Sequence, residues 1–153
     1  MLRDKKIAAV FFAYYPDLAN RYLPYILNLP KTPHICLISS RQETLDTYSK
    51  LFREFDLDFE CRIKPNQGRD FSAYCIAARD IYDKYDYVCC LKDKKAPHTS
   101  YLAAESFDKQ CWDSVLFSRD YVNNCLRLFY DHHSAGMIFS PPPNFGPYTA
   151  LGN

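Results

Sequence analysis

The residues best suited to chemistry lie in a short turn, residues 63–71 (IKPNQGRDF). Asn66 and Gly68 tolerate the left-handed backbone of a tight turn. Asp70 is the expected N-cap of the amphipathic segment that follows, and Arg69 beside a helix N-terminus is suited to hold an anion. On residue types alone, the alternative is a turn that does no more than cap a helix.

A second polar loop, residues 92–98 (KDKKAPH), follows the apolar run 87–91. Its three lysines surround Asp93 and form a positive patch, for which the alternative is an ordinary solvated loop. Together with Arg69, such a patch would offset the charge of a diphosphate leaving group, which elsewhere is the role of a divalent metal. Asp93 alone is a poor Mg²⁺ or Mn²⁺ ligand set, so we predict no metal-binding residues and leave a need for either ion open.

The chain as a whole alternates apolar runs with amphipathic segments. Runs typical of buried strands are 6–14, 34–39 and 87–91; 58–63 alternates like an edge strand, and 136–140 is a last short strand. Helical periodicity covers 17–29, 40–55, 70–85, 103–116 and the segment from 118. This order predicts a single α/β domain over residues 1–153, with a mostly parallel sheet flanked by helices on both faces.

In parallel sheets ligands bind beyond the carboxyl ends of the strands. We therefore expect four loops at one edge of the sheet: 14–17, 39–41, 66–70 and 92–98. All four carry polar groups suited to a phosphate or a sugar.

Several residues predict how individual helices begin or end. Asp17 is placed to cap the first helix, within which Pro24 predicts a kink. Ser40 and Glu43 have the spacing of a capping box. The pair His132–His133 fits a helix C-terminus better than a ligand site.

Composition excludes several classes of protein. Hydrophobic content of 48% with 16% aromatic residues predicts a packed core, and a net charge of +1 gives no reason to expect nucleic acid as a partner. Seven cysteines without a CxxC pair favour reduced, buried thiols in a cytoplasmic protein. Dinucleotide, P-loop and GxSxG motifs are absent, as is any run long enough to span a membrane. The irregular sequence after residue 140 suggests a truncated part of a longer protein.

The segment 66–98, NQGRDFSAYCIAARDIYDKYDYVCCLKDKKAPH, resembles the core of the rhamnan synthesis F (RgpF-type) family. The shared pattern is an N-x-GRD turn, a helix, YDYV and a lysine-rich loop. KIAAVFFAYYPDLANRYLPYILNLP and AGMIFSPP also fit, so the resemblance covers nearly the whole chain. It implies a glycosyltransferase that acts in the synthesis of rhamnose-containing cell-surface polysaccharide or lipopolysaccharide, with a GT-A-like, Rossmann-like nucleotide-sugar fold.

The resemblance also assigns candidate site residues. The positions that match the family pattern are Asn66, Gly68, Arg69, Asp70, Lys94, Lys95 and His98. Many relatives have His-Thr ahead of the paired lysines, where this chain has Lys92-Asp93, and this departure puts the roles of these two residues in question.

The mechanism that follows is transfer from a nucleotide-diphospho-sugar such as dTDP-rhamnose to a glycan on a lipid carrier. Tyr14, Tyr15 and Ser39 would lie near the base and ribose, Asn66, Arg69 and Asp70 near the ribose or diphosphate, and Lys94, Lys95 and His98 at the leaving diphosphate. Asp93, His98, Asp70 and a residue beyond the terminus are alternative general bases. Such an enzyme would work in the cytoplasm, at or near the inner face of the membrane. The rival hypothesis is a non-catalytic domain that binds a glycan or a partner protein.

Overall fold

The computed structural model describes residues 5–30, 33–95 and 101–141. The chain forms two compact units. The first comprises Met1–Pro24 and Leu29–Lys94, and the second comprises Tyr25–Asn28 and Lys95–Asn153.

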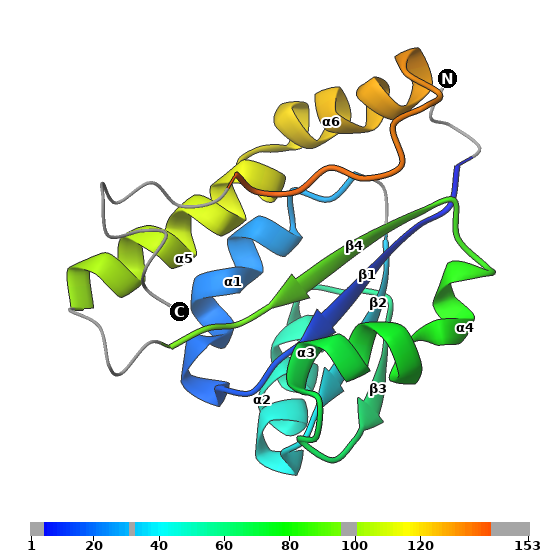
Figure 1. The fold of residues 1–153 in the computed structure, drawn as a ribbon. Helices are drawn as coiled ribbons and strands as arrows, with labels where there is room; N and C mark the ends of the chain where they lie inside the picture. Colours follow the sequence, from blue (N-terminus) through cyan, green and yellow to red (C-terminus); the bar gives the residue numbers. More distant parts are fainter. Residues whose placement is uncertain (1–4, 31–32, 96–100, 142–153) are drawn as a thin grey trace. The chain divides into compact units, whose positions relative to one another are not determined.

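The first unit is built on a four-stranded parallel sheet (Figure 1). Its strands are β1 (Ile7–Phe12), β2 (His34–Ser39), β3 (Phe59–Ile63) and β4 (Tyr87–Lys92), in the order β3-β2-β1-β4. β1 and β2 are almost wholly buried in the middle of the sheet, and β3 lies at an edge as predicted. The prediction of a buried fourth strand was wrong, because β4 forms the other edge and Cys90 on it is exposed.

Helices cover both faces of this sheet, which confirms the predicted α/β class. On one face lie α1 (Ala19–Ile26), preceded by the 3₁₀ turn η1 (Pro16–Leu18), and α2 (Gln42–Glu54). On the other face lie α3 (Arg69–Ser72), the π-helical turn η2 (Ala73–Ala77) and α4 (Arg79–Tyr82) (Figure 1). The connection from β3 to β4 crosses the sheet in the opposite direction to the two before it, so a crossover of the same hand places its helices on the opposite face.

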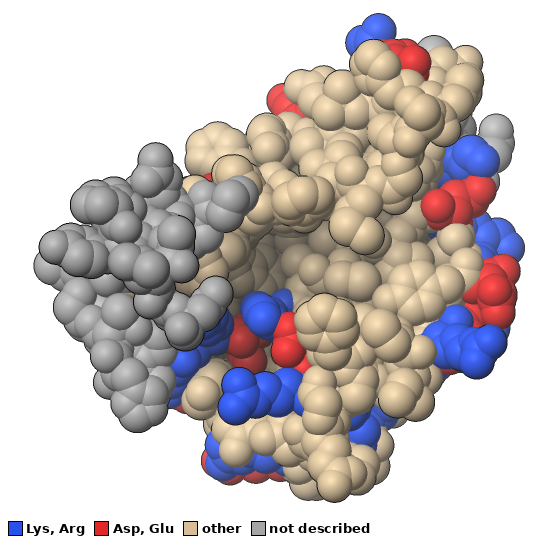
Figure 2. Space-filling view, viewed as in Figure 1, with Lys and Arg blue, Asp and Glu red and all other residues tan. Residues whose placement is uncertain are grey.

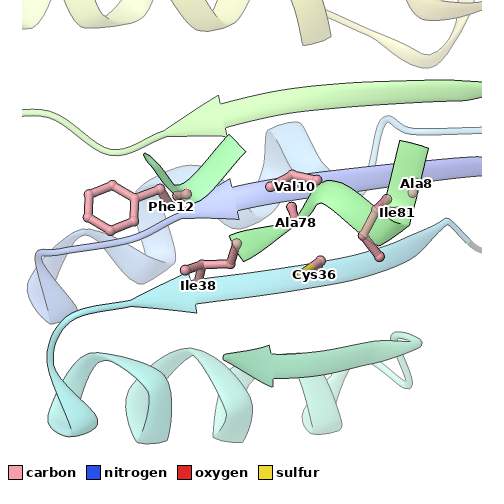
Figure 3. Close-up of a cluster of buried hydrophobic side chains, with 8 residues drawn as sticks. Ala8, Val10, Phe12, Cys36, Ile38, Ala78 and Ile81 are labelled. Carbon is pink, nitrogen blue, oxygen red and sulfur yellow. The ribbon is translucent and has the colours of Figure 1, made fainter. Parts of the chain in front are cut away.

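Alternate residues of β1 fill the two halves of the core. The Phe11 ring packs edge-on against Tyr22 and Tyr48, with centroid distances of 6.2 and 5.2 Å. Val10 faces the other way, into a cluster formed by β1, β2 and the α3–α4 segment, whose buried members are Ala8, Val10, Phe12, Cys36, Ile38, Ala73, Ala78 and Ile81 (Figure 3). This is the pattern of a strand buried on both faces.

The cysteines are only partly as predicted. All seven are free thiols, but Cys36 is the buried one, whereas Cys61, Cys75 and Cys90 are exposed. Burial raises the pKa of Cys36 to about 12, so this thiol stays protonated and behaves as an apolar core group. Exposure of the other three follows from the positions of β3, η2 and β4 at the outside of the unit, which apolar runs alone do not reveal.

Two predicted helix N-caps in this unit were wrong, Asp17 by two residues and Ser40 by one. Pro16 begins η1, so Tyr15 is the N-cap and Asp17 lies inside the turn. The N-cap of α2 is Arg41, and the Ser40 hydroxyl is buried without a hydrogen-bond partner among the described residues. Pro24 lies within α1 as predicted.

An ion-pair network ties β3 to α4. The Arg62 guanidinium donates to both carboxylate oxygens of Asp80, at 2.5 and 3.0 Å, to the Ala77 carbonyl at 2.5 Å and to Glu60 at 2.7 Å. Lys84 adds a second ion pair to Asp80 at 2.7 Å. Hydrogen bonds from Arg62, and then from Lys84, hold the pKa of Asp80 well below its usual range.

This network predicts an acid-dependent stability. Because the pKa of Asp80 is lowered in the folded state, its contribution to stability is complete above about pH 4 and falls as the pH drops toward the folded-state pKa. In Arg62→Met we expect most of this fall to disappear, together with a loss of stability at neutral pH. Urea unfolding at about pH 6 and at about pH 3 measures the difference. Arg79→Met, an exposed arginine on α4, is the matched control; an unchanged acid response in Arg62→Met would contradict the assignment.

The second unit contains α5 (Tyr101–Leu116) and α6 (Arg119–Asp131). α6 starts directly after residue 118, where the periodicity predicts a helix to begin. Ser118 is its N-cap, because its hydroxyl accepts from the Tyr121 amide at 3.2 Å, and His132 is the C-cap. Trp112 is buried, and its ring lies 5.5 Å from that of Tyr25.

The last predicted strand, 136–140, is not formed. None of the strands in the described part of the chain pairs with it, so it lacks the ladder of hydrogen bonds that a strand requires. Met137 and Phe139, within this segment, are 75% and 71% exposed. Among the described helices, none combines the length and the apolar character needed to cross a bilayer.

Candidate functional site

The first three predicted loops, and the fourth as far as Lys94, lie in the first unit at the carboxyl ends of the strands. Figure 2 shows basic and acidic side chains gathered side by side where β1 and β4 end, while much of the face formed by α3 and α4 is uncharged. The loops are joined to one another by specific side-chain contacts.

The turn after β3 has the conformation that its glycine requires. The Asn66 carbonyl accepts from the Arg69 amide at 3.1 Å, and Gly68, with φ 69° and ψ 5°, has the values of the third residue of a type II turn. Gly68 is therefore the N-cap of α3, and the prediction of Asp70 in that role was wrong. Within this turn the second residue with a positive φ is Arg69, at 43°, in place of the predicted Asn66.

Lys64 holds this turn together from inside. Its ammonium donates to the carbonyls of Pro65, Gln67 and Arg69, at 2.6, 3.3 and 3.2 Å. It also lies 5.0 Å from the centre of the Phe12 ring. Because three N–H groups meet three carbonyls, the Lys64 ammonium supports the turn and is not left to bind a ligand.

An ion pair connects α3, which follows the turn after β3, to the last residue of β4. The Lys92 ammonium lies 2.6 Å from Oδ2 of Asp70, with the Lys92 side chain 49% exposed and that of Asp70 19% exposed. The segment after β3 and the end of β4 therefore meet at the carboxyl ends of the parallel strands, as the topology predicts. Lys92 stands opposite Phe12 in the last residue pair of the β1–β4 ladder, so a rigid strand positions its side chain.

Asp93, the next residue, faces into the protein. It is 7% exposed, and its Oδ2 accepts from the amides of Tyr14 and Tyr15 at 2.8 and 2.6 Å. Its own amide donates to the Phe12 carbonyl at 3.3 Å. A carboxylate thus accepts the hydrogen bonds of the amides between the ends of β1 and β4. The strand order reverses at this point, which is where an open α/β sheet usually binds its ligand.

The loops after β1 and β2 are also joined. The Tyr14 carbonyl accepts from the Thr44 hydroxyl at 3.0 Å, and the Arg41 guanidinium lies 5.4 Å from the centre of the Tyr14 ring. Tyr14 and Tyr15 meet edge-on at 5.1 Å. Ser39 is fully buried, and its hydroxyl accepts from the Arg41 amide at 3.1 Å, so it serves the loop from within.

The remaining predicted residues fall in three places. Arg69 is exposed, and within the described residues its guanidinium makes no hydrogen bond or ion pair. Lys94 is exposed, and its amide donates to the Tyr22 hydroxyl at 3.2 Å. Lys95 begins the second unit, and His98 lies outside the described residues.

Sequence reasoning underrated Lys92 and missed Lys64. A departure from the family pattern put Lys92 in question, yet it makes the contact that joins the two loops. The available signal was its position as the last residue of the strand that pairs with β1. In the described part of the chain, no three side chains of His, Cys, Asp or Glu are arranged to hold a metal ion.

Comparison with known proteins gives one result. The family model for rhamnan synthesis protein F (RgpF) matches residues 1–153, the whole chain. No curated protein and no solved structure matches it. The chain therefore belongs to the rhamnan synthesis protein F family, and its role lies in a polysaccharide pathway.

Proposed function

We propose that this chain is a glycosyltransferase that takes a sugar from a nucleotide-diphospho-sugar, with a GT-A-like donor site at the carboxyl edge of its parallel sheet. The observation that carries the proposal is the meeting of the two loops through Lys92 and Asp70, which places Arg69, Lys92 and Lys94 on neighbouring loops. Membership of a polysaccharide-synthesis family supports a sugar donor, with dTDP-rhamnose as the expected one.

In this proposal the cations stabilise the departing diphosphate. An acceptor hydroxyl on a glycan or lipid-linked glycan attacks the anomeric carbon, the bond from that carbon to the diphosphate oxygen breaks, and a base takes the hydroxyl proton. Charge grows on the nucleoside diphosphate as it leaves, and fixed cations on rigid elements stabilise it. Asp70 and His98 remain the candidate bases. Asp93 is a weaker candidate base than the sequence suggests, because its Oδ2 accepts hydrogen bonds from two amides. The nucleotide donor implies work on the cytoplasmic side of a membrane.

Binding of dTDP tests the donor site. In Arg69→Ala we expect dTDP to bind roughly 10- to 100-fold more weakly by calorimetry, the usual cost of one charge-assisted hydrogen bond to phosphate. Arg79→Ala is the control, since Arg79 is also an exposed arginine but lies on α4. Equal binding by both variants would remove Arg69 from the site, and absence of dTDP binding by the folded native protein would refute the donor site itself.

A second function is favoured by a different observation. Phe71, Ile76 and Tyr82, on the α3–α4 segment, are 75%, 74% and 43% exposed, and together they resemble an interaction surface more than a solvated helix face. A non-catalytic domain that binds a glycan or a partner protein would use this surface and ignore dTDP. The calorimetric experiment therefore separates the two functions.

A further inference from the structure

The ligand chemistry of the loops after β3 and β4 bears on how a diphosphate would be held. Divalent Mg²⁺ or Mn²⁺ at a nucleotide site is usually bound by one or two carboxylates together with the substrate phosphates. The carboxylates that these loops supply are Asp70 and Asp93, so the question is whether either is available to a metal ion.

Neither carboxylate fits that role. Oδ2 of Asp93 accepts two amide hydrogen bonds, of 2.8 and 2.6 Å, in a residue that is 7% exposed. Oδ2 of Asp70 lies 2.6 Å from the Lys92 ammonium. A divalent cation bound at Asp70 would sit beside this ammonium and be repelled by it. The described residues of these two loops thus do not fit a resident divalent cation.

The same contacts identify a replacement for the metal. Within the described residues the Lys92 ammonium contacts Asp70 alone, and an ammonium has three N–H groups, so two remain for other acceptors. The side chain is about half exposed and extends from the end of a strand. Arg69, adjacent in sequence to Asp70, is a second exposed cation on the turn after β3.

We infer that the first unit binds the donor's diphosphate without a divalent cation, and that the Lys92 ammonium, held by Asp70, supplies the positive charge in the metal's place. This inference rests on the proposed donor site. It assigns Lys92 to direct contact with the diphosphate and makes Asp70 the residue that positions Lys92.

The test is calorimetric binding of dTDP in EDTA and again with Mn²⁺. We expect the native protein to bind with the same affinity, within about twofold, in both buffers. Lys92→Met should weaken binding roughly 10- to 100-fold in both, whereas Lys92→Arg should retain most of the affinity because it keeps the charge. Lys84→Met is the matched control, since Lys84 also forms an exposed ion pair with an aspartate, Asp80, at 2.7 Å.

Asp70→Asn separates the positioning role from metal binding. If Asp70 only positions Lys92, the variant binds dTDP in EDTA within a few-fold of the native protein, and Mn²⁺ changes nothing. Binding of dTDP by the native protein only in Mn²⁺, or a Mn²⁺-dependent gain that Asp70→Asn abolishes, would overturn the inference and leave the donor site standing. Absence of binding in both buffers would overturn both.

Discussion

Asp93→Ala is expected to lower the free energy of unfolding by about 3 kcal/mol, because it leaves two backbone amides without their acceptor and charge-assisted hydrogen bonds contribute about 1.5–3 kcal/mol each. The amides are those of Tyr14 and Tyr15, which follow β1, and the carboxylate that binds them is 7% exposed. Asp93→Asn keeps one acceptor oxygen, so we expect about half the loss. Urea unfolding followed by circular dichroism measures all of these variants.

The chain provides a matched control at the other end of the same two strands. Asp86, just before β4, accepts from the Lys6 amide at 2.8 Å and pairs with the Lys5 ammonium at 2.8 Å, but it is exposed to solvent. Asp86→Ala removes a comparable link between β1 and β4 in water, so it should cost clearly less than Asp93→Ala. Equal losses in the two variants would show that burial adds nothing to the Asp93 contacts.

Gly68→Ala is the second change expected to have a large effect, a loss of about 3 kcal/mol. Left-handed backbone costs a residue with a side chain about 1–2 kcal/mol, and Gly68 has φ 69°. A Cβ at Gly68 would also lie 2.8 Å from Cβ of Ser72, and overpacking of this kind typically costs about 1–3 kcal/mol. Ser72 has little freedom to move, because its hydroxyl donates to the carbonyls of Gln67 and Arg69 at 2.6 and 3.2 Å.

Gly136→Ala is the control for Gly68→Ala. Beyond its chain neighbours, no heavy atom lies within 4 Å of the Cβ that it would add, and the φ of Gly136 is not in the left-handed region. We expect its stability to change by less than about 0.5 kcal/mol. If Gly68→Ala is equally mild, the turn after β3 is not confined to this conformation, and the pairing of Asp70 with Lys92 is less rigidly set than its geometry implies.

The order of the elements could be predicted from the sequence, whereas the sheet edges could not. Apolar runs report that a segment is buried on average, so β1 and β2 were identified, but the runs do not give the strand order. Tyr87–Lys92 has the composition of a central strand and lies at an edge. Residues 136–140 have the composition of a strand but find no partner in the described chain, because pairing is a property of two segments and not of one.

The candidate site was predictable in location but not in its contacts. The rule that parallel strands share one carboxyl edge brought residues 66–70 and 92–94 together correctly. Residue types did not reveal that Asp93 faces two amides and that Lys92, the less favoured neighbour, faces Asp70. Successive side chains along a strand point to opposite faces. Which of two adjacent residues faces the site therefore depends on where the strand stops, and the end of an element is its least certain boundary.

The π turn in the crossover between β3 and β4 changes the direction in which the side chains of the helical segment point. It adds one residue to the turn between α3 and α4, and one residue corresponds to a rotation of roughly 100° about a helix axis. Asp70 before this turn reaches Lys92 on β4, while Asp80 after it reaches Arg62 on β3, and these strands are the two opposite margins of the sheet. The extra residue thus rotates the side chains that follow it relative to those before it, so that one short helical segment pairs with both edge strands of the sheet.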